Sequence, residues 1–383
     1  MNSREKFLSV LDGDNREICM KTEFAYWAGT IKQWFKEGLP QKALIAEDIT
    51  DSESLRGSKP LSDQYVKKVD LNVMDYFKLD SYLEKFPFDL SPMLETEIIE
   101  ENSNYKIFTD NFGIKQKIYK HDSSILLILE YPIKSRDEFE NYKLLYDKDF
   151  KKRLPADFDN LSAALNKRDF PIRLGGNPFG FSFLARHLMG DYAYLINLYD
   201  NPDFIKDFND FFLEYVLEYF SVILQKIQVD CIFIIEDVAY RSGSFISPEM
   251  FKEFLSPNYI RFIDYLKQFN IKNIFVDCDG KINELIPLWI NVGVNGLFPL
   301  EAVNDIEKIR EDFPYLKLMG GFNKKVLFKD SDKTEIDKEL EKTYRMIKKG
   351  RYIPHIDHAV SPDVTWQNFK YYRTRLNNFI DSL

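Results

Sequence analysis

The feature that most constrains the fold of this chain is a short apolar run that ends abruptly in polar residues, repeated through its second half. The run at 273–276 leads directly into Asp277, Cys278, Asp279 and Gly280. Similar runs lead into Glu236 with Asp237, Glu301, Asn323 with Lys324, and Asp357 with His358. Helix-like sequence separates most of these runs, which is typical of a parallel sheet. We therefore predict an α/β fold, a TIM-type (β/α)8 barrel with its functional site at the carboxyl ends of the strands.

The remaining sequence is compatible with a single barrel domain that spans residues 1–383. Residues 18–27 are interpreted as the first strand and its exit, and aromatic residues at helical spacing predict a helix over 202–228. Residues from about 39 to 135 are polar and irregular, and the alternating residues at 105–119 predict a β-hairpin. We interpret 39–135 as an N-terminal excursion with an inserted β-hairpin, which forms a lid over the barrel mouth.

Composition excludes several classes of partner. The net charge of −9 is spread along the chain without a basic block, so no nucleic-acid partner is expected. No apolar run approaches membrane-spanning length, and residues 1–6 contain no signal-like apolar core. The three cysteines are isolated, which suits a reducing compartment. We therefore expect a cytoplasmic protein without a membrane partner.

The acidic strand ends are the strongest candidates for chemistry. On a strand, Asp277 and Asp279 point to the same side and Cys278 to the other, so the two carboxylates converge. The barrel brings Glu236, Glu301, Asp357, His358, Arg241 and Lys324 to the same end. Such crowding requires either raised pKa values or a bound cation. Two interpretations stay open: a divalent metal held by Glu236, Asp277, Asp279 and His358, or a proton-sharing cluster with an Asp or His as general acid.

The proposed catalytic set is Asp277, Asp279, Glu236, Arg241 and Lys324. Arg241 is a candidate for holding a substrate carboxylate or phosphate, and a structural ion pair is the alternative. Amphipathic or polar residues near strand exits suit the rim of a ligand pocket. On this basis we assign substrate binding to Glu23, Tyr26, Trp27, Tyr240, Asn177 and Glu301. Ordinary aromatic packing is the alternative for Trp27.

Several of these segments together resemble the uroporphyrinogen decarboxylase-like superfamily, which includes the corrinoid-dependent methyltransferases. The resemblance covers nearly the whole chain and is sharpest at 23–27, 236–243, 277–280, 293–301, 320–324 and 352–363. It implies a (β/α)8 barrel with the site at the carboxyl end. The decarboxylases of the superfamily open with an arginine-rich motif that clamps a polycarboxylate, whereas this chain offers Glu23 at the first strand exit. An acid there would repel such a substrate, which disfavours porphyrinogen.

The resemblance to the methyltransferase branch also comes with departures. In that branch a His-x-Cys pair and a later Cys bind zinc, and here Asp277, Asp279 and the region of Asp357 and His358 take those places. An oxygen-rich site is harder than a thiolate site, so activation of a thiol acceptor is disfavoured. A divalent metal such as zinc could still polarise a methyl donor as a Lewis acid.

The leading hypothesis is therefore a methyltransferase that moves a methyl group between a small O- or N-methylated compound and a corrinoid. The resemblance implies that the corrinoid, a cobalamin, is carried by a partner protein, and a homodimer is a further expectation. One alternative is a carboxy-lyase that acts on a tetrapyrrole or a smaller carboxylate. Another is a non-catalytic barrel that binds a tetrapyrrole or a corrinoid protein.

Overall fold

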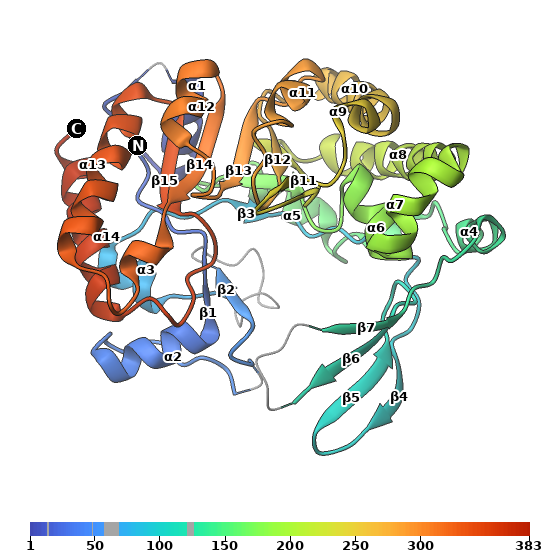
Figure 1. Ribbon diagram of the computed structural model, residues 1–383, viewed down its shortest axis with the longest axis horizontal. Helices are drawn as coiled ribbons and strands as arrows, with labels where there is room; N and C mark the ends of the chain where they lie inside the picture. Colours follow the sequence, from blue (N-terminus) through green and yellow to red (C-terminus); the bar gives the residue numbers. More distant parts are fainter. Residues whose placement is uncertain (14, 48, 57–68, 121–125) are drawn as a thin grey trace.

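A curled parallel sheet forms the centre of the molecule. The computed structural model describes residues 1–13, 15–47, 49–56, 69–120 and 126–383. Within these residues, seven strands pair in parallel in the order β15-β14-β13-β12-β9-β8-β3 and curl into most of a barrel (Figure 1). The predicted α/β class and TIM-type (β/α)8 architecture are therefore confirmed.

The elements alternate along the chain as expected for this fold. The barrel strands are β3 (Glu84–Lys85), β8 (Ile172–Gly175), β9 (Cys231–Ile235), β12 (Ile274–Asp277), β13 (Gly296–Leu300), β14 (Lys317–Phe322) and β15 (Tyr352–Ile356). The helical segments after β8 are α6 (Phe181–Met189), α7 (Asp191–Asp200), α8 (Pro202–Leu224), α9 (Pro248–Met250), η3 (Phe251–Leu255), α10 (Ser256–Leu266), η4 (Lys267–Phe269), α11 (Ile286–Asn291), α12 (Ile306–Asp312), η5 (Lys324–Leu327), α13 (Lys333–Lys349) and α14 (Trp366–Asp381). Those before β8 are α1 (Ser3–Asp12), α2 (Ala28–Glu37), α3 (Asn72–Phe77), α4 (Arg136–Lys143), η2 (Phe150–Arg153) and α5 (Phe158–Leu165).

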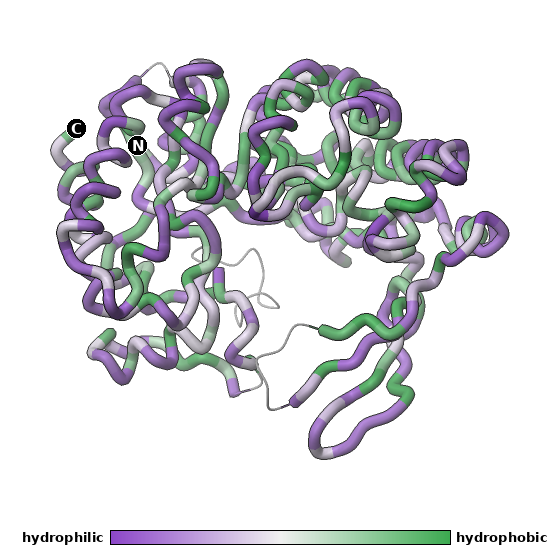
Figure 2. The backbone as a smooth tube through the Cα atoms, in the orientation of Figure 1, coloured by the Kyte–Doolittle hydropathy of each residue, from purple (hydrophilic) through white to green (hydrophobic). Residues whose placement is uncertain are grey.

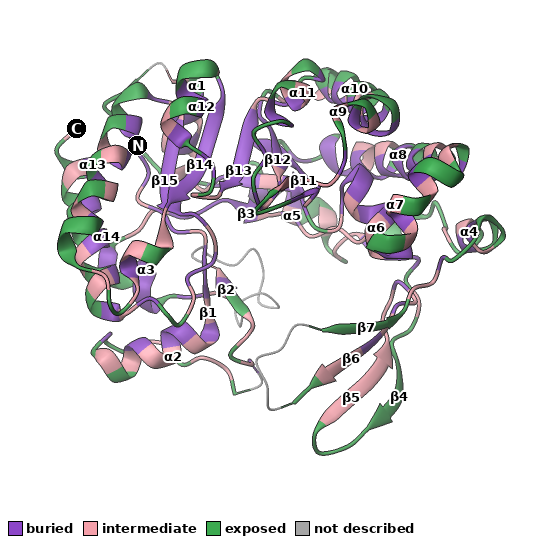
Figure 3. Ribbon diagram, in the orientation of Figure 1, coloured by how far each residue is buried: buried purple, intermediate pink, exposed green. Residues whose placement is uncertain are grey.

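Alternation along the strands divides their side chains between two apolar clusters. Cys231 and Phe233 of β9 and Phe275 of β12 belong to the inner cluster, which includes residues of α1 at one end of the barrel. Ile232, Ile234 and Val276 belong to the outer cluster, together with the surrounding helices. Strands that are covered on both faces in this way are continuous apolar runs, as the sequence showed. Burial is highest in these central strands (Figure 3), where hydrophobic residues recur along the backbone (Figure 2).

The prediction that residues 18–27 form the first barrel strand is wrong. Only β1 (Ala25–Trp27) is a strand, and it pairs antiparallel with β2 (Ser54–Arg56) outside the barrel sheet. The preceding segment lies between the edge strands β3 and β15: the Lys21 carbonyl accepts a hydrogen bond of 2.8 Å from the Asp80 amide, and the Glu23 carboxylate accepts one of 3.0 Å from the Ile356 amide. In a regular strand a backbone carbonyl would accept the hydrogen bond from the Ile356 amide, but here the Glu23 carboxylate accepts it. The segment therefore occupies the eighth position of the barrel without forming a regular strand.

The predicted insertion contains an antiparallel sheet that projects from the barrel (Figure 1). Its strands, in spatial order, are β4 (Glu97–Glu101), β5 (Tyr105–Thr109), β6 (Lys115–Tyr119) and β7 (Leu127–Glu130). The predicted hairpin is therefore confirmed as β5 and β6. The assignment of all of 39–135 to an insertion needs correction, since β3 lies in this range and is an edge strand of the barrel. Its two charged residues carried no apolar signal. Parts of the predicted lid, 57–68 and 121–125, lie outside the described residues.

None of the helices formed by the described residues combines the length and the hydrophobicity needed to span a bilayer.

Candidate functional site

Three acidic side chains and a histidine meet where β9, β12 and β15 end. Asp277 closes β12, and its neighbour on the inner face, Asp279, lies with its carboxylate 3.5 Å from Nε2 of His358. Asp237 follows β9, and its Oδ1 accepts a hydrogen bond of 3.2 Å from the Asp279 amide. Cys278 is buried in the outer cluster, as the predicted alternation requires. We call Asp237, Asp277, Asp279 and His358 the acidic cluster.

Three members of this cluster, Asp237, Asp277 and His358, have raised pKa values. Burial raises the pKa of Asp277 well above its ordinary value, Arg173 opposes the shift, and the charges of Asp237 and Asp279 add to it. Burial also raises the pKa of Asp237 to about 6, with a further contribution from Asp279. The pKa of His358 is raised chiefly by its hydrogen bond to Asp279. The shifts of Asp277 and His358 both favour the protonated form, which is the condition for general acid catalysis.

Two more predicted residues lie beside the acidic cluster. Glu301 follows β13, and burial followed by the charge of Asp279 raises its pKa. Asp357 follows β15, and its oxygens accept hydrogen bonds from the amides of Ala302 (3.3 Å) and Lys324 (3.4 Å). Burial raises the pKa of Asp357, and the Lys324 charge opposes that shift. Glu301, Asp357 and Lys324 thus lie with the acidic cluster, as the sequence predicted.

Two cations on barrel strands, Lys85 and Arg173, were not predicted from the sequence as site residues. Arg173 lies on β8 and Lys85 on β3, and the parallel register pairs these two residues directly. The Arg173 guanidinium lies 4.6 Å from the ring centre of Phe233, which is an inner residue of β9. The signal was present, because Arg173 is a charged residue within an otherwise apolar run, at an inward position of a barrel strand.

Glu236 does not join the acidic cluster. Its fully buried carboxylate accepts hydrogen bonds from the amides of Phe181 (3.2 Å) and Ser182 (2.8 Å) and from the hydroxyl of Tyr259 (2.8 Å). It therefore caps the amino end of α6 from the outer side of the barrel, and burial raises its pKa to about 7. This position differs from the predicted catalytic and metal-binding one, since the carboxylate already has three protein donors.

Glu23 and Tyr26 also lie in the protein interior. The Glu23 carboxylate forms a fully buried ion pair with Arg373 of α14 (3.0 Å) and accepts a hydrogen bond of 2.6 Å from Tyr372. Tyr26 is fully buried between the rings of Trp34 (5.8 Å) and Phe369 (5.9 Å). The geometry gives both residues structural contacts in place of the predicted contact with a substrate.

The remaining predicted residues lie on loops around the barrel end. Tyr240 and Arg241 are exposed in the tight turn between β10 (Ala239–Tyr240) and β11 (Gly243–Ser244). Asn177 is exposed, and its carbonyl accepts a hydrogen bond of 2.5 Å from Lys85. Trp27 is half-buried at the start of α2. Within the described residues, none of these four side chains forms a hydrogen bond or an ion pair with the acidic cluster.

The predicted metal ligands do not form a set that fits a metal ion. Among the residues with described positions, no group of three or more His, Cys, Asp or Glu side chains is arranged to hold one. Glu236 is occupied by the α6 amides, and His358 faces Asp279. Divalent-metal binding therefore stays a prediction from sequence, and no step below depends on it.

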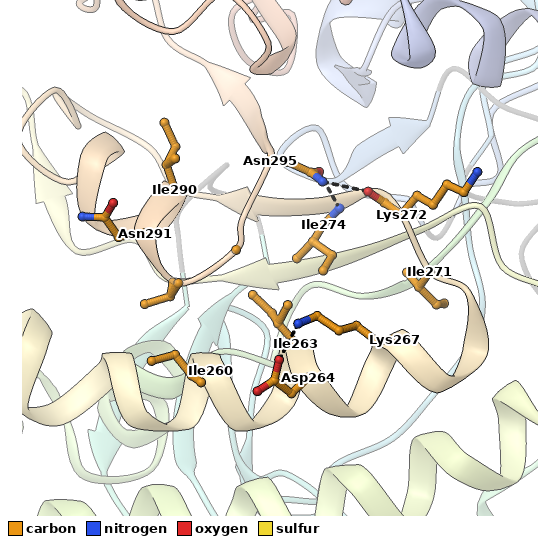
Figure 4. Close-up of a pocket in the computed structure, with 12 residues that line it drawn as sticks. Ile260, Ile263, Asp264, Lys267, Ile271, Lys272, Ile274, Ile290, Asn291 and Asn295 are labelled. Carbon is orange, nitrogen blue, oxygen red and sulfur yellow. Dashed lines mark hydrogen bonds and ion pairs between the residues drawn. The ribbon is translucent and has the colours of Figure 1, made fainter.

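A surface pocket of about 490 Å³ lies away from this site (Figure 4). It is lined by residues at the amino ends of β12 and β13, among them Lys272, Ile274 and Asn295, and by α10. The Asn295 side chain bridges the Lys272 carbonyl and the Ile274 amide. Since catalytic groups of barrel enzymes lie at the carboxyl ends of strands, we do not assign the reaction to this pocket.

Comparisons with known proteins agree with this architecture. A solved structure of a methyltransferase from Methanosarcina mazei is 15% identical to this chain with a TM-score of 0.58, over 100% of this chain and 99% of that one. At that identity the likeness shows a shared fold. No curated protein sequence matches the chain. The family model of uroporphyrinogen decarboxylase (URO-D) matches residues 109–378, which is well over half of the chain. The chain therefore belongs to the uroporphyrinogen decarboxylase (URO-D) family.

Proposed function

We propose that this protein is a methyltransferase that moves a methyl group from a small O- or N-methylated compound to a corrinoid carried by a separate protein. The observation that carries the proposal is the acidic cluster, in which a half-buried Asp277 lies near the Asp279–His358 pair at the carboxyl end of the barrel. The shared fold with a methyltransferase supports it.

Proton transfer is the task of the acidic cluster in this reaction. When the bond between the methyl carbon and an oxygen or nitrogen breaks, its electron pair stays on that heteroatom, which then requires a proton. Asp277 and His358 both have raised pKa values and can donate one. The cluster later regains the proton from water. A reduced corrinoid would supply the nucleophile that accepts the methyl group.

A spectroscopic assay tests this proposal. Purified protein is mixed with cob(I)alamin and a panel of methoxyaromatic compounds and methylated amines, and the visible spectrum is followed for the methylated corrinoid. We expect turnover with at least one donor and a loss of about 10²- to 10⁴-fold in Asp277→Asn, since that is the usual contribution of a general acid. Asp312→Asn, which removes an exposed partner of Lys308, serves as the control and should keep full activity. An unchanged spectrum with every donor contradicts the proposal.

Decarboxylation is the second candidate, and one observation favours it. Arg173 lies close enough to Asp277 to oppose the rise in its pKa, so a cation and an acid with a raised pKa are neighbours. Such a pair could bind a carboxylate and protonate the carbon left behind after CO₂ departs. Release of CO₂ from a carboxylate substrate, without methyl transfer to the corrinoid, would favour this candidate over the first.

A further inference from the structure

Two neighbouring cations lie on the inner side of the barrel, where the charge of Asp277 acts on both. Lys85 and Arg173 are register partners on β3 and β8. Leu83, two residues before Lys85, belongs to the inner cluster, so Lys85 points to the inside of the barrel like Arg173. Within the described part of the chain, neither the Lys85 nor the Arg173 side chain forms a salt bridge. Lys85 and Arg173 are both half-buried, and two cations side by side repel each other, which is unfavourable unless an anion joins them.

The hydrogen bonding of the two cations is incomplete. Nη1 of Arg173 is buried and has no hydrogen-bond partner among the described residues. Lys85 donates to the carbonyl of Asn177 (2.5 Å) and lies 4.6 Å from the ring centre of Phe88. Burial and the Arg173 charge lower the pKa of Lys85 to about 7, as expected of an ammonium group beside a second cation. An arginine nitrogen without a partner is therefore available to an acceptor from outside the chain.

Aromatic rings connect the cations to the acidic cluster. The Arg173 guanidinium lies 6.0 Å from the ring centre of Phe298, which is 5.0 Å from that of Phe24. The Phe24 ring is in turn 6.1 Å from that of His358. Phe24 is half-buried, so part of its ring is open to a ligand. A planar apolar body with a negative group at one end and the methyl-bearing heteroatom at the other matches this sequence of contacts.

We propose that Arg173 and Lys85 form a subsite for the carboxylate of the substrate, so that the methyl donor is an aromatic carboxylate. The role of the carboxylate as part of a methyl donor rests on the proposed function, whereas the subsite itself does not depend on methyl transfer. A carboxylate would neutralise both cations and satisfy Nη1 of Arg173.

Calorimetric binding of benzoate and of its neutral isostere benzamide tests the subsite directly. Hydrogen bonds to charged groups contribute enough for us to expect about a tenfold or greater preference for benzoate. The preference should disappear in Arg173→Met and persist in weakened form in Arg173→Lys. Lys281→Met, which removes an exposed cation on the loop after Gly280, is the matched control and should leave the preference unchanged.

The outcomes separate the subsite from the proposed function. Equal binding of the two probes, no benzoate binding, or an unchanged preference in Arg173→Met overturns the subsite. A benzoate preference that depends on Arg173, in a protein that transfers no methyl group from any methoxybenzoate or amine, supports the subsite and contradicts the methyltransferase proposal. Thermal melting controls for folding. Arg173→Met removes a repulsion between two cations and should melt no lower than the wild type. If Arg173→Met melts at a lower temperature, Arg173→Lys is the conservative variant that still tests the subsite.

Discussion

The Glu23–Arg373 pair shows how a single buried charge can decide stability. Both side chains are fully buried, and Asn377 holds the other edge of the Arg373 guanidinium. We expect Glu23→Gln to lower the free energy of unfolding by about 3–5 kcal/mol, because it leaves an uncompensated buried cation. Urea denaturation measures this loss.

The matched control is Glu307→Gln, which breaks an exposed pair with Arg345 on the protein surface. Exposed pairs contribute roughly 0–1 kcal/mol, so its effect should be small. Equal losses in the two variants would argue against a structural role for Glu23 and return it to the predicted substrate-binding set.

The pairing of Asp279 with His358 predicts a measurable titration. Because Asp279 stabilises the charged imidazole, the His358 pKa in the folded protein lies above its ordinary value of 6.5. The ion pair therefore contributes to stability fully below pH 6.5, and the contribution is lost as the pH rises through the folded pKa. NMR titration of the imidazole should show a lower pKa in Asp279→Asn than in the wild type. An identical midpoint would mean that the two side chains do not interact in solution.

The sequence predicted which acids end the strands but not which way each points. Asp277 and Asp279 were placed correctly on one side, since strand alternation carries through to them. The same alternation explains Glu236: Phe233 is an inner residue, so Ile234 and Glu236 point outward, towards α6. Asp237 lies four residues after Phe233 and therefore on the inner side, and its φ of 44° turns the backbone out of the strand conformation there. No pattern in a single sequence reveals such a turn.

Helix α6 depends on close contact with the end of β9. A Cβ added at Gly180, the residue before α6, would lie 1.5 Å from the carbonyl oxygen of Ile235. Since backbone cannot yield as a flexible side chain does, Gly180→Ala should displace α6 from the Glu236 carboxylate and cost about 3 kcal/mol or more. Thermal unfolding followed by circular dichroism measures this change.

Gly38→Ala at the end of α2 is the comparison. Gly38 has open space around its Cβ position but a φ of 110°, so only backbone strain of about 1–2 kcal/mol is expected there. If Gly180→Ala were no more destabilising than Gly38→Ala, the contact between α6 and β9 would not be rigid.

Elements defined by apolar periodicity were the easiest to predict. The aromatic residues of α8 at that spacing are buried, as predicted, and the barrel strands β9, β12, β13, β14 and β15 coincide with the apolar runs. β3 was missed, because two charged residues paired to one neighbour cannot be distinguished from loop sequence. The segment at 20–24 was predicted to be part of a strand. Sequence alone does not show that Glu23 pairs with a residue 350 positions away, and this pairing is part of what holds the segment in an irregular conformation.

The projecting sheet gives the whole molecule an exposed apolar edge. All four residues of β7 are exposed, including Leu127 (51%) and Leu129 (43%), and β7 is an edge strand of its sheet. The opposite edge, β4, carries three glutamates. Unprotected apolar edges favour association between copies of a chain. We therefore expect concentration-dependent self-association, consistent with the predicted homodimer.

Charges placed on this edge test the expectation. The double variant Leu127→Lys with Leu129→Lys should remain monomeric at concentrations where the wild type associates, as measured by sedimentation velocity. Leu144→Lys changes a leucine that is 82% exposed elsewhere on the surface and should behave like the wild type. A wild type that stays monomeric at all concentrations would contradict both the edge argument and the homodimer.

The ion pair between Glu23 and Arg373 also has a consequence for how the chain is made. The segment that fills the eighth position of the barrel is held by α14, and Glu23 and its partner Arg373 lie 350 positions apart in the chain. During translation, residues 20–24 therefore have no partner until α14 has emerged from the ribosome. Contacts of such long sequence separation form slowly. A nascent chain stalled before α14 should expose the gap between β3 and β15, and it is at this stage of synthesis that a chaperone would protect the barrel.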